Sequence, residues 1–261
     1  MLILLPPSEG KAAPARRGRP VDLAALPHPE LDPLRARLLD ALAAVSALPG
    51  APEALGLSPG LAAEVARNVD LRTTPARRAI EVYTGVLYAA FDHPTLSAVG
   101  RRRANRTVRV QSALWGPIGP TDAVVPYRLP MTASLPGLGP VAARWRPVLA
   151  PVMDGLAGTG VVVDGRSSAY ASVWRPSGPA AKAYVAVRVF TDVAGRRTVV
   201  SHAAKHTRGL VARWLCEAAR LPRTPADVAA LVAEHRTSEL VPDGRGGWFL
   251  DVLVPPAGSG G

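Results

Sequence analysis

Two short, uninterrupted apolar runs constrain the fold of this chain most. Leu2–Leu5 contains no polar residue and stops at the pair Pro6-Pro7, and Val161–Val163 is a second run of the same kind. Apolar runs of this length without alternation are typical of strands that are buried on both faces. Because proline lacks an N–H group for the ladder of a central strand, the first strand is expected to end before Pro6. A polar loop, Ser8–Lys11, then follows the end of this strand.

Helical patterns are mixed with further strand patterns along the rest of the chain. Helical spacing of apolar residues appears in the segments 31–45, 147–156 and 210–221. The pairs Ser58-Pro59, Thr74-Pro75 and Thr224-Pro225 each place a capping hydroxyl before a proline, which predicts three more helix starts. Further strands are expected at 108–114 and 248–254, and 184–191 and 198–201 flank a short turn as in a hairpin.

This order predicts an α+β fold with one mixed sheet flanked by helices, because strands and helices do not alternate regularly. The chain has 261 residues, of which 48% are hydrophobic, enough for a sizeable core. We expect a single domain over residues 1–254 and a flexible tail at 255–261. Segment 12–30, which carries Arg16, Arg17 and Arg19 among prolines, is expected to be a mobile basic loop.

Several classes of protein are excluded by what the sequence lacks. No apolar run reaches the roughly 18 residues of a membrane span, and Met1–Leu5 is too short and lacks the basic start of a signal peptide. Cys216 is the only cysteine, so neither a disulfide framework nor a cysteine-based zinc site can form within the chain. We expect a cytoplasmic protein with no membrane partner and no cofactor.

The charge is strongly positive, with 31 Lys and Arg residues against 20 Asp and Glu residues and a net charge of +11. A basic surface gains free energy on a polyanion by releasing its counterions, which favours a nucleic acid as partner. However, only three of the cations are lysines, and Ala, Gly and Pro are abundant. A coding bias would produce the same imbalance without any ligand, so both explanations stay open.

Two local patterns are candidates for binding DNA. A cluster of arginines at 101, 102, 103, 106 and 109 precedes a predicted strand, either as a solvated loop or as a ridge that contacts phosphates. Segment 135–145 resembles the turn of a helix-hairpin-helix motif, in which Gly137 and Gly139 allow a tight turn. Backbone N–H groups near Val141 would then receive a phosphate oxygen. An ordinary turn remains the alternative.

Other polar clusters suggest a pocket. Ser8–Lys11 does not fit the phosphate loop of nucleotide triphosphatases, because Lys11 is followed by alanine, but polar turns at strand ends commonly line sites. His202, Lys205, His206 and Arg208 form a second cluster without metal-ligand spacing. Lys205 is a candidate anion anchor or a nucleophile of lowered pKa. No metal site is expected.

The order of several blocks over nearly the whole chain resembles the peroxide-stress protein YaaA family, in its PPSEGK variant. The blocks are residues 1–11, 83–88, 112–122, 126–129, 164–170 and 200–210. At residues 8–11 the sequence differs from better-known members, which carry a shorter Ser-Pro-Ala-Lys-Thr stretch. Residues 12–20 are also more basic than the family pattern.

The resemblance implies a cytoplasmic protein that helps cells to survive hydrogen peroxide by limiting free iron and iron-dependent oxidative DNA damage. It also implies a YaaA-type α+β fold that binds DNA through a basic cleft and a helix-hairpin-helix-like element. Whether the family catalyses a reaction does not follow from it.

Two functional hypotheses follow. The first is a stress protein that binds duplex or structured DNA through its backbone, without sequence preference. Its candidate contacts are Arg101, Arg102, Arg103, Arg106, Gly137, Gly139, Val141, Arg144, Lys205 and Arg208. The second is an enzyme that acts on a nucleotide or on a damaged or modified base. Its candidate pocket residues are Ser8, Glu9, Lys11, Tyr83, Arg128, Ser168, Tyr170, Lys205 and His206.

Overall fold

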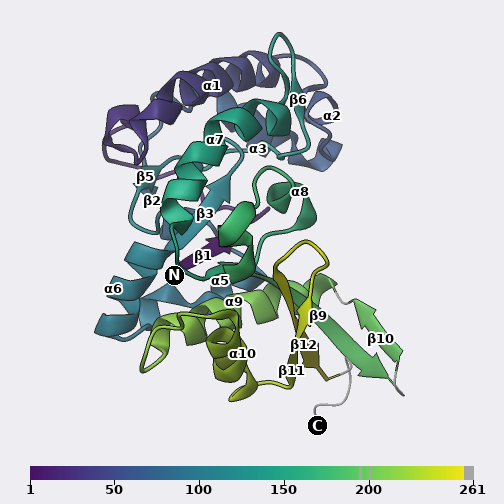
Figure 1. Cartoon of the computed structure of the whole chain (residues 1–261). Helices are drawn as coiled ribbons and strands as arrows, with labels where there is room; N and C mark the ends of the chain where they lie inside the picture. Colours follow the sequence, from purple (N-terminus) through teal and green to yellow (C-terminus); the bar gives the residue numbers. More distant parts are fainter. Residues whose placement is uncertain (194–195, 200, 256–261) are drawn as a thin grey trace.

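The computed structural model describes residues 1–193, 196–199 and 201–255. Its centre is a mixed sheet with the strand order β11-β12-β9-β8-β1-β3-β4, and β10 pairs with the outer part of β9 (Figure 1). The predicted α+β fold with a mixed sheet flanked by helices is confirmed. Two short pairs, β2 with β5 and β6 with β7, lie outside this sheet.

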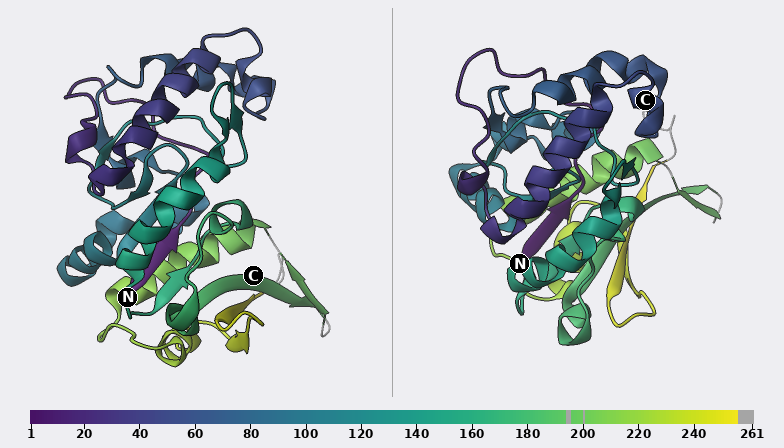
Figure 2. Two further views of the ribbon diagram at one scale, coloured as in Figure 1. Left: turned by 45° about the horizontal axis from the view of Figure 1, so that its top comes forward. Right: turned by 90° about the horizontal axis from the view of Figure 1, so that it is seen from above.

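The strands of the main sheet are β1 Leu2–Leu5, β3 Val108–Ser112, β4 Gly116–Ile118, β8 Val162–Asp164, β9 Tyr184–Val193, β10 Arg196–Val199, β11 Ser238–Pro242 and β12 Trp248–Val254. The short pairs consist of β2 Arg77–Arg78, β5 Ala123–Val124, β6 Ser134–Leu135 and β7 Gly139–Pro140. In both views of Figure 2, β10 and the outer part of β9 extend away from the rest of the molecule.

The α-helices are α1 Asp32–Ser46, α2 Ala51–Ala54, α3 Ala62–Ala66, α4 Ala79–Val82, α5 Val86–Phe91, α6 Ala98–Thr107, α7 Val141–Ala157, α8 Ser168–Ala171, α9 Ser201–Glu217 and α10 Pro225–Ala233. Short 3-10 helices are η1 Leu23–Ala25, η2 Pro29–Leu31, η3 Pro59–Leu61, η4 Arg67–Asp70, η5 His93–Thr95 and η6 Gly178–Ala183. Helices α1 to α3 gather at one end of the molecule, and α9 and α10 lie at the other (Figure 1).

Strand β1 lies between two parallel strands in the middle of the main sheet. It pairs in parallel with β3 on one side and with β8 on the other, and all four of its residues are buried. The chain therefore leaves β1 for β3 and later returns to add β8 on the opposite side. In sheets of parallel strands, such a change of direction opens a crevice at the carboxyl ends of the strands, where ligands commonly bind.

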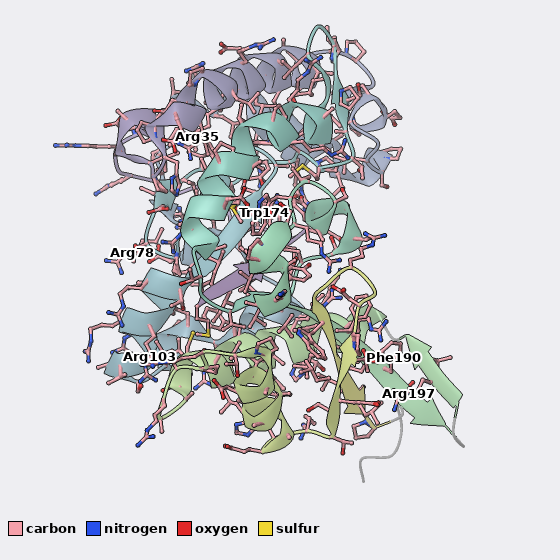
Figure 3. The ribbon with its side chains drawn as sticks, in the orientation of Figure 1. Arg35, Arg78, Arg103, Trp174, Phe190 and Arg197 are labelled. Carbon is pink, nitrogen blue, oxygen red and sulfur yellow. The ribbon has the colours of Figure 1, made fainter. Side chains whose placement is uncertain are left out.

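Helix α1 is attached to the sheet by a buried arginine that the apolar pattern did not predict. Arg35 is fully buried and donates through Nε to the carbonyl oxygen of Trp115 at 3.0 Å. Its other nitrogens donate to Asp32 and to the carbonyl groups of Pro27 and His28. Figure 3 labels this side chain at the α1 end of the molecule. Because a buried guanidinium needs all its donors satisfied, Arg35 fixes this end of the fold.

Helices α5 and α9 approach each other very closely at one glycine. A Cβ atom built on Gly209 would lie 2.1 Å from the carbonyl oxygen of Leu87. No side chain fits there without moving backbone, so Gly209 sets the distance between the two helices. This contact positions the start of α9 beside the loop that follows β1.

Several predicted boundaries are confirmed and others were wrong. Thr224 caps α10 in a full capping box, as expected. Thr74-Pro75 does not begin a helix, because the Thr74 hydroxyl donates to the carbonyl of Asp70 at 2.8 Å and Pro75 pairs with Pro20 in an isolated bridge. At Ser58-Pro59 a 3-10 turn precedes α3, and the serine side chain makes no capping bond.

Two helices begin earlier than their apolar patterns indicated. Helix α9 starts at Ser201, and strand β10 ends before it at Val199. The apolar repeat did not predict this start, because the first turns of α9 carry polar and basic residues. Helix α7 starts at Val141 and includes Pro147 and Pro151. Both prolines are exposed, so they interrupt the hydrogen bonding of α7 on its solvent face.

The basic segment 12–30 contacts the body of the protein at several points. Ala12 donates to the carbonyl of Val82 at 2.9 Å, Pro20 pairs with Pro75, and Leu26 is buried. Arg16, Arg17 and Arg19 are exposed between these attachments. The mobility of this segment stays a prediction, and residues 256–261 of the predicted tail and turn residues 194–195 lie outside the described residues.

Candidate functional site

A cavity of about 460 Å³ lies at the carboxyl ends of β1 and β8. The lining comes from the loop after β1, Leu57, residues 84–88 at the start of α5, segment 128–132, and Ser167, Ala169 and Tyr170 after β8. Lys205 and Arg208 of α9 complete the wall. The cavity therefore occupies the crevice that the change of direction at β1 creates, and its size suits a small ligand such as a nucleotide.

The loop after β1 is held against α5 by specific hydrogen bonds. The Ser8 hydroxyl donates to the carbonyl of Gly10 and accepts a bond from the N–H of Thr84 at 3.0 Å. The Tyr88 hydroxyl donates to the carbonyl of Pro6 at 2.7 Å. Ser8 is thereby a structural residue of the loop, and the loop presents the following side chains, Glu9 and Lys11, to the cavity.

Lys11 lies against aromatic rings at the wall of the cavity. Its Nζ atom is 4.7 Å from the centre of the Tyr127 ring and 5.8 Å from that of Tyr83, and it donates to the carbonyl of Ser8 at 2.8 Å. Burial lowers the pKa of Lys11 from its ordinary value to about 7, and the positive charge of Arg128 contributes in the same direction. Glu64 and Glu9 oppose this shift in part. Near neutral pH the amine is therefore present in both its charged and its neutral form.

The other cations of the cavity are paired in different ways. Arg128 forms an ion pair with Glu64, and Lys205 lies 3.4 Å from a carboxylate oxygen of Glu9. Arg208 donates through Nε and Nη2 to the carbonyl of Val187 at 3.3 Å, and burial lowers its pKa. Four cations with Glu9 as the acidic side chain on the lining make the cavity suited to an anionic ligand.

A group of buried tyrosines supports Lys11 from behind. The Tyr127 hydroxyl is 2.6 Å from the Ser112 hydroxyl and accepts a bond from the N–H of Ala113. The Tyr83 hydroxyl is buried and has no hydrogen-bond partner among the described residues. Burial raises the pKa of both phenols, so they stay neutral in the protein.

A buried ion pair fixes the loop after β8. Asp164 accepts bonds from the guanidinium of Arg166 and from the Tyr184 hydroxyl, the latter at 2.7 Å. Arg166 also donates to the side chain of Gln111 and to the carbonyl of Trp174. Asp164 and Arg166 fall within a block that resembles the YaaA family, but charge spacing alone does not predict that they pair in the core.

Most of the predicted pocket residues converge. Ser8, Glu9, Lys11, Arg128, Tyr170 and Lys205 line the cavity, together with Arg208. Tyr83 lies behind Lys11 rather than on the lining. Ser168 and His206 are exposed and do not line it. Sequence reasoning missed Thr84, Tyr88, Met131 and Ser167, of which all but Met131 lay in a block with a pocket candidate.

The arginines at 101–106 form a helix surface instead of a loop. Arg103 donates to carbonyl groups at the end of α9, including that of Cys216, and Arg101 donates to those of Pro94 and Leu96. Arg102 and Arg106 are exposed and make no hydrogen bond or ion pair to any described residue. Figure 3 shows Arg103 and Arg78 on the same side of the molecule.

The segment resembling a helix-hairpin-helix turn is a small β-hairpin before one helix. Strands β6 and β7 pair, and Gly137 and Gly139 have φ values of 70° and 82°, so the predicted tight turn is present. The flanking element before the turn is a strand, and the helix-hairpin-helix motif is therefore not confirmed. The N–H of Val141 already donates to the carbonyl of Ala133, and the Arg144 guanidinium donates to that of Leu138.

Among residues 1–193, 196–199 and 201–255, no group of three His, Cys, Asp or Glu side chains is placed to hold a metal ion. None of the helices in these ranges is both long enough and apolar enough to cross a membrane.

The fold and the cavity define a class of protein: a mixed α+β protein with a cavity lined by cations at the carboxyl ends of its parallel strands. Comparison with known proteins then identifies the family. Residues 1–234 match the family described as peroxide stress protein YaaA, and the chain belongs to this family.

Relatives cover the chain over almost its whole length. A UPF0246 protein of Streptomyces coelicolor is 45% identical over 97% of this chain and 98% of its own. UPF0246 proteins of Corynebacterium efficiens and Corynebacterium glutamicum are 35% and 36% identical, over 94% and 88% of this chain and 97% and 91% of their own lengths. The family resemblance inferred from the motif blocks is confirmed.

Proposed function

We propose that this protein binds DNA through its phosphate backbone and takes a phosphorylated nucleotide unit into the cavity beside β1. The observation that carries the proposal is the convergence of Lys11, Arg128, Lys205 and Arg208 on one cavity. Phosphate is the anion that such a set of ammonium and guanidinium groups recognises best.

The cavity offers complementary surfaces for the rest of a nucleotide. Leu57, Val86, Leu129, Pro130 and Met131 contribute apolar area to its lining, and the Tyr170 side chain contributes an aromatic ring. A base or sugar can pack against these groups while the phosphate contacts the cations. This arrangement favours a ligand that has both a charged and an apolar part.

A second basic surface supports contact with a longer DNA strand. Arg78, Arg101 and Arg102 line a separate hollow of about 520 Å³, next to His93 and Asn105. Arg106 is exposed on the same helix as Arg101 and Arg102. Such side chains bind phosphates, which carry no sequence information, so we expect binding without sequence preference.

The second candidate function is catalysis on the bound nucleotide or base. The observation that favours it is the Lys11 amine, which is partly neutral near pH 7 and faces the cavity. Protection of cells from iron-dependent oxidative DNA damage is the biological role that we infer from membership of the peroxide stress family. Survival of peroxide in cells that lack the protein, with and without an iron chelator, tests this role.

DNA binding is tested by fluorescence anisotropy with a labelled duplex and a single strand of the same sequence. Lys205→Gln should weaken binding of the single strand, whose nucleotides can enter the cavity, more than that of the duplex. Arg102→Gln together with Arg106→Gln should weaken both equally. Arg37→Gln, an exposed arginine on α1, is the matched control. Equal affinities for all four proteins would contradict the proposal.

A further inference from the structure

The described part of the chain contains all three of its lysines, and their surroundings differ sharply. Lys182 is exposed on η6, and the Lys205 side chain is half exposed and pairs with Glu9. Lys11 lines the cavity, and its amine lies against two tyrosine rings behind it. Lys205 therefore suits the role of an anion anchor, and Lys11 occupies the environment that a nucleophilic amine requires.

The position of Lys11 leaves its reactive lone pair available. One hydrogen of the amine donates to the carbonyl of Ser8 at 2.8 Å, and the tyrosine rings cover another side. Lys11 also contributes to the lining of the cavity, so a ligand there can reach the nitrogen atom. The hydrogen bond to Ser8 forms equally with a neutral amine, whose lone pair is then free to attack.

We propose that Lys11 forms a covalent imine with the aldehyde carbon of a phosphorylated sugar bound in this cavity. The proposal rests on the proposed function, because the sugar enters as part of a phosphorylated ligand. The neutral amine attacks the aldehyde carbon to form the C–N bond of a carbinolamine. The C–O bond then breaks, the oxygen leaves as water with the two hydrogens that the amine nitrogen gives up, and a C=N bond joins Lys11 to the sugar. No oxidant or reductant is consumed.

The class of substrate follows from the cations around Lys11. Lys205 and Arg208 line the same cavity and can hold a phosphate while the aldehyde faces Lys11. An aldehyde of this kind occurs in the open-chain form of a free pentose phosphate and in an abasic nucleotide of a DNA strand. Both sources present the same chemistry to the amine, and the experiment separates them.

The test traps the imine in the full-length protein by reduction with sodium cyanoborohydride. The probes are 2-deoxyribose 5-phosphate, unphosphorylated 2-deoxyribose, and a single strand and a duplex that each carry one abasic site. Intact-mass measurement and peptide mapping locate the stable adduct. Lys182 and the terminal amine serve as internal controls for ordinary amine reactivity. Lys11→Arg, checked for folding by its thermal midpoint, removes the proposed nucleophile.

We expect adduct on Lys11 at least about tenfold faster than on Lys182 at pH 7, because an ordinary lysine is almost entirely charged there. Reaction with the unphosphorylated sugar should be slower, and Lys205→Gln should remove that difference. The rate at Lys11 should rise to half its maximum near pH 7. Adduct with the free sugar phosphate alone, or with the abasic strands alone, supports the proposal and identifies the source.

Modification spread evenly over the amines would overturn the proposal that Lys11 forms an imine. An absence of adduct with every probe would also overturn it. Calorimetric titration with 2-deoxyribose 5-phosphate then distinguishes the two proposals. Binding without adduct overturns the imine and leaves the proposed function standing. An absence of both binding and adduct for every phosphorylated probe contradicts both. If Lys11→Arg does not fold, the position of the adduct in the unaltered protein still shows whether Lys11 is the nucleophile.

Discussion

The Nζ atom of Lys11 lies 4.7 Å from the centre of the Tyr127 ring, although the two residues come from distant parts of the chain. The loop after β1 carries the lysine, and the segment after β5 carries the tyrosine. The contact combines burial of the amine with an electron-rich face that attracts its charged form. Burial, together with the positive charge of Arg128, lowers the pKa of Lys11 to about 7, although the charges of Glu64 and Glu9 oppose the shift.

This shift predicts a dependence of stability on pH. The unfolded chain binds a proton at Lys11 up to about pH 10, whereas the folded protein releases it near pH 7. Between these values the unfolded state holds more protons, so this group makes the folded state more stable as pH rises. The cost of burying the charged amine is fully present below pH 7.

Lys11→Met removes this contribution and keeps the apolar stem. The free energy of unfolding of the parent protein minus that of Lys11→Met should rise between about pH 7 and pH 10, with a slope approaching roughly 1.4 kcal/mol per pH unit. Urea unfolding at several pH values measures it. A difference that stays constant with pH would show that Lys11 titrates as an ordinary lysine.

Gly209→Ala should destabilise the protein by about 1–3 kcal/mol or more, because the new methyl group would overlap the backbone carbonyl of Leu87. Gly155→Ala is the matched control within helix α7, where a Cβ meets nothing within 4 Å. That substitution should instead stabilise by up to about 1 kcal/mol. Thermal unfolding of both variants checks the prediction, which fails if the two shift the midpoint alike.

Asp164→Asn should lower the free energy of unfolding by about 3–5 kcal/mol, because it leaves the buried guanidinium of Arg166 without its counter-charge. The double variant Asp164→Asn with Arg166→Met should recover part of this loss, because no unpaired charge remains. Denaturant unfolding of the single and double variants measures the recovery. If the double variant is no more stable than Asp164→Asn, the cost arises from lost packing and not from an uncompensated charge.

Arg102→Gln with Arg106→Gln should reduce the salt dependence of DNA binding. Removing two phosphate contacts lowers the magnitude of the slope of log affinity against log salt by roughly 1.8. Stability should not change, because neither side chain bonds to a described residue. Arg103→Gln provides the contrast: it should lower the thermal midpoint, because Arg103 donates to carbonyl groups at the end of α9. An unchanged slope in the double variant would show that these α6 arginines do not contact DNA phosphates.

The elements with strong local signals were predictable from the sequence. Leu2–Leu5 and Trp248–Val254 are strands, and the capping box at Thr224 begins a helix as expected. Each of these signals acts within a few residues. The Thr74-Pro75 signal failed because the threonine hydroxyl found a partner in the preceding turn instead of capping a following helix.

The convergence of the cavity residues could be anticipated only in part. Polar residues at strand ends pointed to Ser8–Lys11, but the order of strands around β1 brings α9 to the same edge, and local patterns do not encode that order. The low pKa of Lys11 depends on Arg128 and on burial by distant residues. Local spacing likewise did not indicate that Arg35 would be buried and would donate to the backbone carbonyl of Trp115.

The most direct test of the central claim, a phosphate-binding cavity beside β1, is calorimetric titration with thymidine 5′-monophosphate and with thymidine. We predict that the nucleotide binds more tightly than the nucleoside and that Lys205→Gln weakens only the nucleotide, by roughly tenfold for one charge-assisted contact. Lys182→Gln, which replaces an exposed lysine that does not line the cavity, should change neither affinity. Equal affinities for nucleotide and nucleoside, or equal effects of the two lysine variants, would contradict the account.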